Sequence, residues 1–177
     1  MKFIETILKG AYVVEPEKVN DERGFFSRIW CQKEFKAYGL DPVLAQANIA
    51  FSKKSGTLRG MHFQIAPHEE TKLLYCSKGS IYDVIIDLRS TSKTFKKWFS
   101  IKLTAENHKM LYVPKGFAHG YQTLEDNTEV IYWISEFYTP ESYSCVRWND
   151  PAFGVIWPKA EHRIISEKDK NCPDFKS

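Results

Sequence analysis

The sequence predicts an all-β double-sheet jelly roll with short peripheral helices. Short segments rich in β-branched and aromatic residues recur about every dozen residues, and Gly, Pro, Asn and Asp separate them, which is the spacing of strands in a sandwich or barrel. These segments do not alternate with helices, which argues against a parallel α/β fold. A jelly roll closes most sheet edges and leaves an interior wide enough for a ligand.

Nine segments have the composition of strands: Phe25–Trp30, Leu44–Phe51, Thr57–Gln64, Thr71–Ser77, Ser80–Leu88, Phe95–Leu103, Lys109–Val113, Gly120–Leu124 and Glu129–Phe137. We expect Lys78-Gly79 to form a hairpin turn, because glycine accepts the positive φ that such a turn needs. One helix is predicted over Gln32–Tyr38, followed by Gly39, with Phe35 on its apolar face.

The size of the chain indicates one domain. With 177 residues, 43% of them apolar, residues 1–177 are expected to form a single unit with its own core. The polar tail from about residue 159 is expected to pack back on it as a strap, or to be a partly frayed end. The net charge of +3 indicates no nucleic-acid or membrane partner and would suit an anionic small molecule.

The cysteines and the apolar runs predict a cytoplasmic protein. Four cysteines lie far apart without a C-x-x-C pair, and they are expected to be reduced thiols; they are Cys31, Cys76, Cys145 and Cys172. Glu5 interrupts the N-terminal apolar stretch, so no signal peptide is predicted. Asp83 and Asp87 interrupt the best later run, well short of a membrane span, and we expect both carboxylates to face outward.

Two stretches place polar side chains where a core is expected. In Thr57–Gln64, strand alternation puts His62 and Gln64 on one face, and Arg59 joins them only if Gly60 carries a bulge. Further along, Lys72 begins another strand segment, and Pro114-Lys115-Gly116-Phe117-Ala118-His119-Gly120 brings a second histidine to the start of a strand.

This layout resembles the two motifs of cupin jelly rolls, which are Gly, five residues, His-x-His, then Glu before a Gly, and later Pro-x-Gly-x-x-His. Here Gln64 stands for the second histidine and Lys72 for the glutamate, so the metal cage is broken. An ammonium cannot replace an anionic metal ligand, and a neutral amide is a poor replacement for imidazole. We therefore expect no metal, and a pocket suited to an anionic ligand and proton transfer.

Each of these residues has a simpler interpretation when taken alone. A single histidine in a strand is more often structural than catalytic, Lys72 alone is usually solvated, and Tyr132 in Val-Ile-Tyr-Trp-Ile is by default a half-buried strand residue. The combination is what favours a functional site.

A longer set of motifs resembles the dTDP-4-dehydrorhamnose 3,5-epimerase family. They run from residue 21 to Ser166-Glu167-Lys168-Asp169 and are Asp21-x-Arg23-Gly24-x-Phe26, Gln46-x-Asn48, Leu58-Arg59-Gly60-x-His62-x-Gln64, Lys72-Leu73, Gly79-x-x-x-Asp83-Val84, Asp87-Leu88-Arg89, Pro114-x-Gly116-Phe117-Ala118-His119-Gly120, Tyr132, Tyr138-x-Pro140, Trp148-Asn149-Asp150-Pro151 and Trp157-Pro158.

The resemblance implies a cofactor-independent isomerase acting on a nucleotide-linked 4-keto-6-deoxy sugar, whose ketone acidifies the C–H bonds at C3 and C5. His62 would be the base and Asp169 its partner, holding the imidazole tautomer. Tyr132 would reprotonate from the opposite face, and Lys72 would stabilise the enolate oxygen.

The resemblance also implies the residues that bind substrate. Those near the sugar and pyrophosphate would be Arg59, His119, Gln46 and Asn48. Arg23 and Phe26 would reach the nucleotide in the neighbouring subunit's site, and Tyr138 would stack on the base, so the active unit would be a homodimer.

One position departs from the family pattern. The family commonly has a glutamate where this chain has Arg28, which leaves CDP-, GDP- and UDP-sugars open beside dTDP. The hexose is also open. Alternatives are an epimerase that inverts one centre, a ketoisomerase on the same fold, a metal-dependent cupin oxygenase or isomerase, and a non-catalytic sugar-nucleotide binding module.

Overall fold

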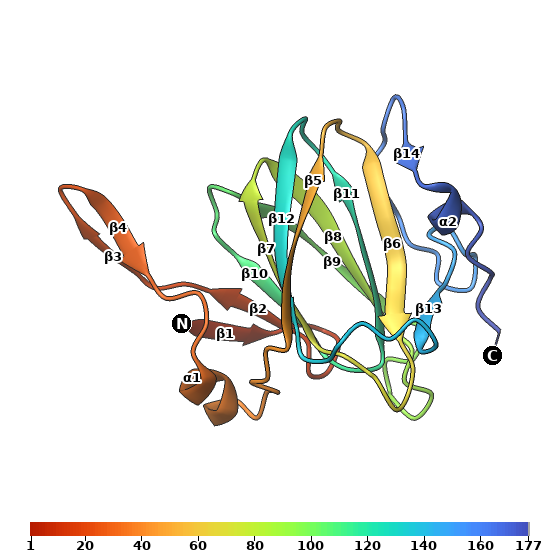
Figure 1. The fold of residues 1–177 in the computed structure, drawn as a ribbon, viewed down its shortest axis with the longest axis horizontal. Coiled ribbons are helices and arrows are strands. Elements are labelled where there is room, and N and C mark those ends of the chain that lie inside the picture. The colour runs from red at the N-terminus through yellow and green to blue at the C-terminus, as the bar shows by residue number, and fades with distance from the viewer. Residues whose placement is uncertain (177) are drawn as a thin grey trace.

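The computed structural model describes residues 1–176 as two facing antiparallel sheets, with a hairpin projecting from one side (Figure 1). One sheet has the order β1-β2-β10-β7-β12-β5. Its strands are β1 (Lys2–Glu5), β2 (Tyr12–Glu15), β10 (Met110–Val113), β7 (Lys72–Lys78), β12 (Thr128–Ile134) and β5 (Gln46–Ser52). The second has the order β13-β6-β11-β8-β9, with β14 added parallel to β6. Its strands are β13 (Tyr143–Cys145), β6 (Thr57–Gln64), β11 (Phe117–Thr123), β8 (Ser80–Asp87), β9 (Trp98–Thr104) and β14 (Ile164–Ile165).

The remaining elements lie outside this double sheet. They are the hairpin of β3 (Lys18–Asp21) and β4 (Gly24–Ser27), the helix α1 (Gln32–Ala37) and the short helix α2 (Glu167–Lys170). Neither helix within residues 1–176 has the length and apolar character needed to cross a bilayer.

The predicted all-β jelly roll is confirmed, and each of the nine predicted strands overlaps an observed one. Thr57–Gln64 has the predicted bounds, and the predicted helix ends one residue early, at Ala37. The hairpin at Lys78-Gly79 was wrong, because β7 and β8 belong to different sheets and the turn crosses between them. Gly79 does have the positive φ expected of it, +73°.

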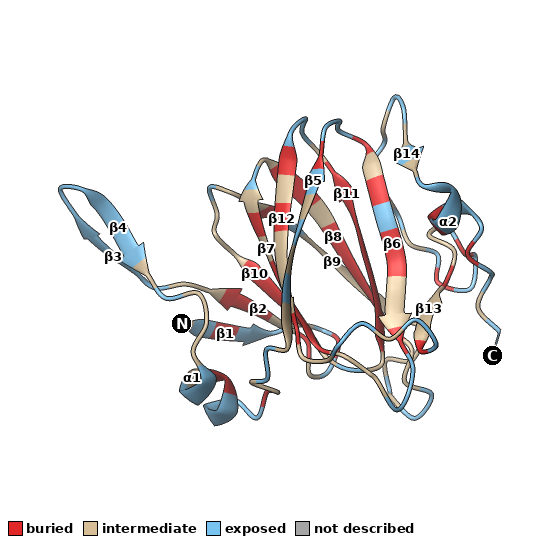
Figure 2. Ribbon diagram, in the orientation of Figure 1, coloured by how far each residue is buried: buried red, intermediate tan, exposed pale blue. Residues whose placement is uncertain are grey.

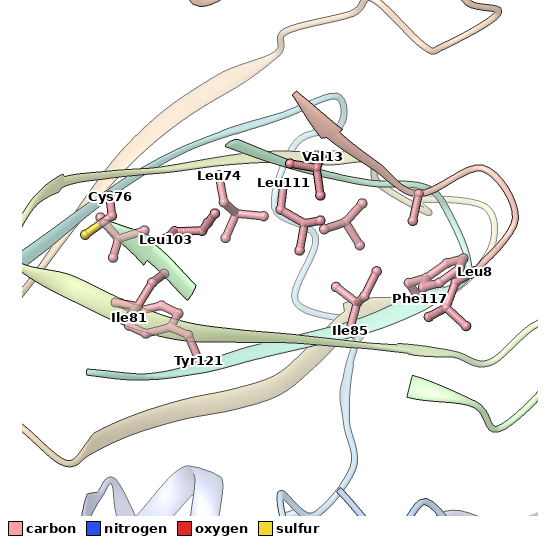
Figure 3. Packing of buried hydrophobic residues seen from close by; sticks show 13 residues of the cluster. Leu8, Val13, Leu74, Cys76, Ile81, Ile85, Leu103, Leu111, Phe117 and Tyr121 are labelled. Atoms are coloured by element: carbon pink, nitrogen blue, oxygen red, sulfur yellow. The ribbon is translucent and has the colours of Figure 1, made fainter. Parts of the chain in front are cut away.

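The space between the sheets is filled by alternate side chains from both of them. Leu74 and Leu111 from the first sheet meet Ile81, Ile85 and Phe117 from the second, and all are buried (Figure 3). Burying each large aliphatic side chain contributes about 1.5–3 kcal/mol. The strands of the two sheets carry most of the buried residues, while the β3–β4 hairpin is exposed (Figure 2).

The prediction that Asp83 and Asp87 face outward was wrong, since both carboxylates are fully buried. They lie on the same face of β8 as Ile81 and Ile85, which points between the sheets. The opposite face of β8 carries Val84 and Ile86, and it is covered by a second apolar cluster that includes Val146 and Phe153. Because both faces of β8 are covered, the alternation of aspartates with apolar residues does not identify a solvent-exposed face in this strand.

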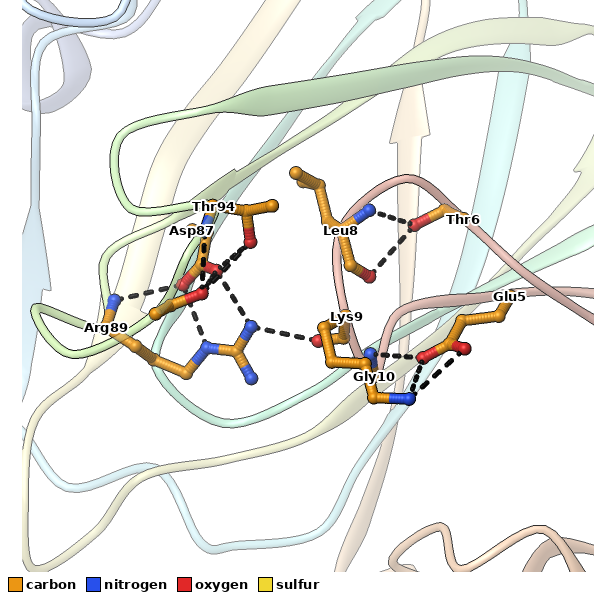
Figure 4. A network of polar contacts seen from close by, with 9 residues as sticks. Glu5, Thr6, Leu8, Lys9, Gly10, Asp87, Arg89 and Thr94 are labelled. Atoms are coloured by element: carbon orange, nitrogen blue, oxygen red, sulfur yellow. Dashed lines mark hydrogen bonds and ion pairs between the residues drawn. The ribbon is translucent and has the colours of Figure 1, made fainter.

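Asp87 shows how this burial is compensated. It accepts hydrogen bonds from Arg89, Ser92 and Thr94 at 2.6–2.8 Å (Figure 4). Burial alone would raise the pKa of Asp87, but these hydrogen bonds outweigh it and lower the pKa to about 2. Arg89 also donates to the carbonyl of Lys9 at 2.9 Å, so the buried carboxylate ties the loop after β1 to the second sheet.

The segment after Pro158 runs back along β6. Ile164 and Ile165 pair with Thr57 and Leu58, and α2 follows directly.

The structure joins Cys145 to Cys172 in a disulfide with the two Cα atoms 5.7 Å apart. The expectation that all four cysteines are reduced was therefore wrong for this pair. The two residues are 27 positions apart, and only the return of the tail brings them together.

Candidate active site

A cavity of about 390 Å³ opens between the two sheets. Side chains from both sheets and from the returning tail surround it. Its lining comprises Gln46, Asn48, Ala50, Arg59, His62, Phe63, Gln64, Glu70, Lys72, His119, Tyr121, Tyr132, Ile134, Tyr138, Tyr143, Ser166, Lys168 and Asp169. Nine of these residues were predicted as site residues from the sequence: Gln46, Asn48, Arg59, His62, Lys72, His119, Tyr132, Tyr138 and Asp169.

A bulge in β6 brings Arg59 and His62 to the same cavity. His62 is paired with His119 and Arg59 with Tyr121, so three steps along β6 match two along β11. Gly60 lies at this shift with φ +127°, and a Cβ there would be 2.5 Å from the Cα of Gly120. Only glycine fits, and the bulge expected at Gly60 is confirmed.

His62 and Asp169 form a hydrogen-bonded pair. The Nε2 of His62 lies 2.8 Å from Oδ1 of Asp169, and the other carboxylate oxygen accepts a hydrogen bond from the backbone N–H of Gly60 at 3.2 Å. Burial alone would raise the pKa of Asp169, but these contacts outweigh it and lower the pKa. A carboxylate at Nε2 favours the proton on that nitrogen, which leaves Nδ1 as the basic atom.

A second imidazole–carboxylate pair lies beside the first. The Nε2 of His119 is 2.6 Å from Oδ1 of Asp83, and both side chains are buried. Within the described chain, Oδ2 of Asp83 has no hydrogen-bond partner. The outward position predicted for Asp83 was wrong, because Asp83 shares the inward face of β8 with Ile81 and Ile85.

Lys72 enters the cavity from the opposite sheet. Its ammonium lies 3.0 Å from Oε1 of Glu70 and donates to the carbonyl of His62 at 3.2 Å. Sequence reasoning did not single out Glu70, although an acid two residues before a buried lysine is the kind of partner that a buried ammonium needs. The ion pair fixes a positive charge beside the histidine.

Tyr132 also projects from the sheet opposite His62. It lies on β12, where it pairs with Asn48 of the neighbouring β5, and Gln46 pairs with Ile134 two residues along. Burial raises the pKa of Tyr132, so its hydroxyl keeps its proton at neutral pH and can donate it. The cavity therefore has an imidazole base on one wall and a phenolic acid on the other.

The tail and the loop before β13 complete the mouth of the cavity. Tyr138 and Tyr143 meet edge to face with ring centroids 6.0 Å apart, and Tyr143 lies 5.6 Å from the His62 ring. Lys168 sits 3.6 Å above the Tyr143 ring. Tyr143, Lys168 and Ser166 were not predicted as site residues, and no local motif distinguishes Tyr143.

Three predicted binding residues lie outside this cavity. Arg23 and Phe26 are on the exposed β3–β4 hairpin, where Phe26 is 75% exposed. Arg28 follows this hairpin and forms an ion pair with Glu34 at 3.0 Å. None of the three touches the cavity of its own chain.

A metal site requires several ligands in one place. Within residues 1–176, no three His, Cys, Asp or Glu side chains gather as a metal site would need. The two imidazoles of the cavity are each engaged by a carboxylate. The donors that remain, an ammonium, a guanidinium and amides, suit an anion.

This arrangement can move protons on a carbon acid. Nδ1 of His62 can accept a proton from a C–H bond, and the hydroxyl of Tyr132 can return one from the other side. Lys72 can stabilise the negative oxygen that forms between these two steps. Arg59 and Lys168 add positive charge for an anionic group near the mouth.

Comparison with known proteins agrees with this chemistry. A sequence profile described as dTDP-4-dehydrorhamnose 3,5-epimerase matches residues 5–177. The protein of that name from Sinorhizobium fredii is 40% identical over 163 residues, which are 92% of this chain and 84% of that protein. The solved Bacillus anthracis dTDP-4-dehydrorhamnose 3,5-epimerase with TDP and PPi bound has a TM-score of 0.94 and 42% identity, covering 98% of this chain and 99% of that chain. The Legionella pneumophila 3,5-epimerase in complex with dTDP-4-keto-L-rhamnose has a TM-score of 0.92 and 32% identity, covering 98% of this chain and 92% of that one.

Proposed function

Since this chain belongs to the dTDP-4-dehydrorhamnose 3,5-epimerase family, we propose that it inverts both C3 and C5 of a dTDP-linked 4-keto-6-deoxyhexose in the cavity between its sheets. The chain is an isomerase that epimerises a nucleotide-linked 4-keto-6-deoxy sugar. The observation that carries the proposal is that the His62–Asp169 pair and Tyr132 line one cavity from opposite sheets.

The proposed reaction removes and returns one proton at each carbon. The C4 ketone acidifies the C–H bonds at C3 and C5, and Nδ1 of His62 takes the proton while Asp169 stabilises the imidazolium. The electron pair moves onto the C4 oxygen, where the Lys72 ammonium stabilises the enolate. Tyr132 then donates its proton to the opposite face of the same carbon. Before the second carbon reacts, His62 releases its proton to solvent and solvent restores the proton of Tyr132.

The remaining polar residues are proposed to hold the substrate. Arg59 is suited to the diphosphate because its planar guanidinium can bind two oxygens. His119, oriented by Asp83, is proposed to hold the sugar with Gln46 and Asn48. The side-chain oxygen of Gln46 accepts a hydrogen bond from the backbone N–H of Tyr138 at 2.7 Å, and the ring of Tyr138 is proposed to stack on the base.

We propose a homodimer with shared active sites, in the cytoplasm. The support is that Arg23 and Phe26 cannot reach their own chain's cavity, since they lie on a hairpin that projects away from it (Figure 1). The edge strand β5 also exposes Ile49 and Phe51 on its outer face, and exposed apolar edges are usually covered.

Mixing two inactive variants tests the shared site. Arg23→Ala and His62→Ala homodimers are each expected to be impaired, while their mixture recovers about a quarter of wild-type activity after subunit exchange, because half of the dimers are mixed and each holds one intact site. Light scattering gives the mass, and NMR gives the activity. A mixture no more active than its components, or a monomeric mass, would contradict the shared site.

The nucleotide is tested with a panel of dTDP-, CDP-, GDP- and UDP-linked 4-keto-6-deoxyhexoses in heavy water. We expect deuterium at both C3 and C5, with the highest kcat/KM for the dTDP sugar. Arg28 lies outside the cavity of its own chain and is paired with Glu34. Arg28→Glu is therefore expected to leave the exchanging carbons unchanged. It is expected to change only the ratio of the KM values for the different nucleotides.

The other outcomes of this panel discriminate between the alternatives. Exchange at one carbon alone identifies a single-centre epimerase, and movement of the ketone from C4 to C3 identifies a ketoisomerase. Binding without any exchange identifies a non-catalytic module, and a metal-dependent cupin would lose exchange on dialysis against a chelator. The first three results overturn the double epimerisation proposed here, and the fourth overturns its cofactor-independent mechanism.

A further inference from the structure

The residue that orients the proposed base lies on a segment with little structure of its own. Asp169 is in α2, a helix of four residues, and helices this short are not stable by themselves in water. Its position therefore depends on what ties the segment to the sheet. On the N-terminal side the tie is β14, and the cap Ser166 accepts a hydrogen bond from the N–H of Asp169 at 3.1 Å.

On the C-terminal side the tie is covalent. Cys172 comes three residues after Asp169 and is bonded to Cys145 of β13. Cys145 is the residue paired with His62 across the β13–β6 ladder. The disulfide therefore closes a ring that runs from His62 across the ladder to Cys145, through Cys172 to Asp169, and back to the His62 imidazole at 2.8 Å.

Noncovalent contacts beyond Cys172 include one buried anchor, since the N–H of Phe175 donates to Oδ2 of the buried Asp150 and its ring lies 5.3 Å from that of Phe153. Arg147 forms an ion pair with Asp174 at 2.6 Å, and the Asp174 side chain is 55% exposed. The N–H of Arg147 also donates to the carbonyl of Pro173 at 2.9 Å. Exposed ion pairs contribute little, and Phe175 lies further along the chain than Cys172, so the disulfide is the nearest firm constraint on this side of Asp169.

The geometry points to the Cys145–Cys172 disulfide as a positioning element for Asp169, which makes epimerisation dependent on the thiol redox state of the protein. This inference rests on the proposed function. A dithiol reduces this bond to two thiols by giving up two electrons and two protons, and it becomes a disulfide itself. A phosphine gives up two electrons and becomes a phosphine oxide, and one water molecule supplies its oxygen and the two thiol protons. The segment from Ser166 to Cys172 then loses its nearest C-terminal constraint, and the next one along the chain is the packing of Phe175.

The other two cysteines provide an internal comparison. Cys76 is buried in the core, and burial raises the pKa of its thiol to about 12, so it is a poor nucleophile. Cys31 is partly exposed beside α1 and remote from the cavity. Redox effects on the site are therefore assigned to the bonded pair.

The test compares the protein before and after reduction with a phosphine. Mass spectrometry of an unreduced digest first verifies the bond by detecting the two peptides joined through Cys145 and Cys172. If air-oxidised protein lacks this linked pair, the inference is overturned. Reduction is expected to lower kcat about tenfold or more, since small misplacements of catalytic groups have effects of this size. The double variant Cys145→Ser/Cys172→Ser should have the kcat of the reduced wild type, both before and after phosphine treatment. Cys31→Ser should have the wild-type kcat in both conditions.

Two readouts separate positioning from general loosening of the fold. In an Asp169→Asn background, reduction should have no further effect on kcat, because the group that it displaces is already gone. The ¹⁵N shifts of the His62 ring should show the proton on Nε2 in the oxidised protein and a mixture of tautomers after reduction.

The results also separate this inference from the proposed function. If oxidised and reduced protein have the same kcat, or if His62 keeps its tautomer on reduction, the positioning role is wrong while the epimerase activity stands. An equal loss on reduction in the wild type and in Asp169→Asn likewise rules it out. If neither redox state exchanges C3 or C5 protons, the proposed function itself fails, whatever the ¹⁵N shifts show.

Discussion

His62→Ala is expected to slow deuterium entry at C3 and at C5 by about a thousandfold. The substitution removes the imidazole that pairs with Asp169, and general base catalysis is worth about 10²–10⁴-fold in rate. Asp169 would then lie buried without its imidazole partner. The measurement is the rate of C–H exchange by NMR in heavy water, at saturating sugar nucleotide.

The matched control for this prediction is His162→Ala. His162 is exposed and lies outside the cavity, so its loss should leave the exchange rate unchanged. If His62→Ala retains full exchange at either carbon, a different base serves that carbon, and the His119–Asp83 pair becomes the candidate.

The second large effect is expected from Tyr132→Phe. The variant keeps the ring in place but removes the hydroxyl, so His62 can still abstract a proton while nothing returns one from the opposite face. We expect inversion to slow about a hundredfold, with exchange that retains configuration persisting at a higher rate. The ratio of exchanged to inverted sugar, read by NMR, is therefore expected to rise sharply.

Tyr75→Phe is the control for this effect. Tyr75 lies on the neighbouring strand β7 but contacts His108 on the outer side of the sheet, so the ratio should not change. Equal loss of exchange and inversion in Tyr132→Phe would count against a role as the acid on the far face.

The sequence alone predicted much of the site, because several of its residues follow strand parity in segments with clear patterns. His62 and Gln64 alternate along a strand whose bounds were predicted without error, and the bulge at Gly60 accounts for Arg59. The strands β1 to β3 were missed because they are four residues each, too short for an alternating pattern to stand out.

What the sequence could not predict depends on contacts between distant segments. Asp83 faces the space between the sheets and not solvent, because a second apolar layer covers the other side of β8. The residue pattern of β8 alone does not show that this layer is present. Residue spacing alone could not place Asp169 at His62, 107 positions away; only the family resemblance indicated that pair.

The amino-acid sequence by itself determined the β architecture and the face that His62 and Gln64 share, since strand alternation is a local property. The tertiary structure alone decided which sheet each strand joined, which carboxylates were buried beside the imidazoles, and which cysteines were bonded. Those outcomes depend on how far the chain returns on itself, and the free energy that selects them comes from packing between elements that are remote in sequence.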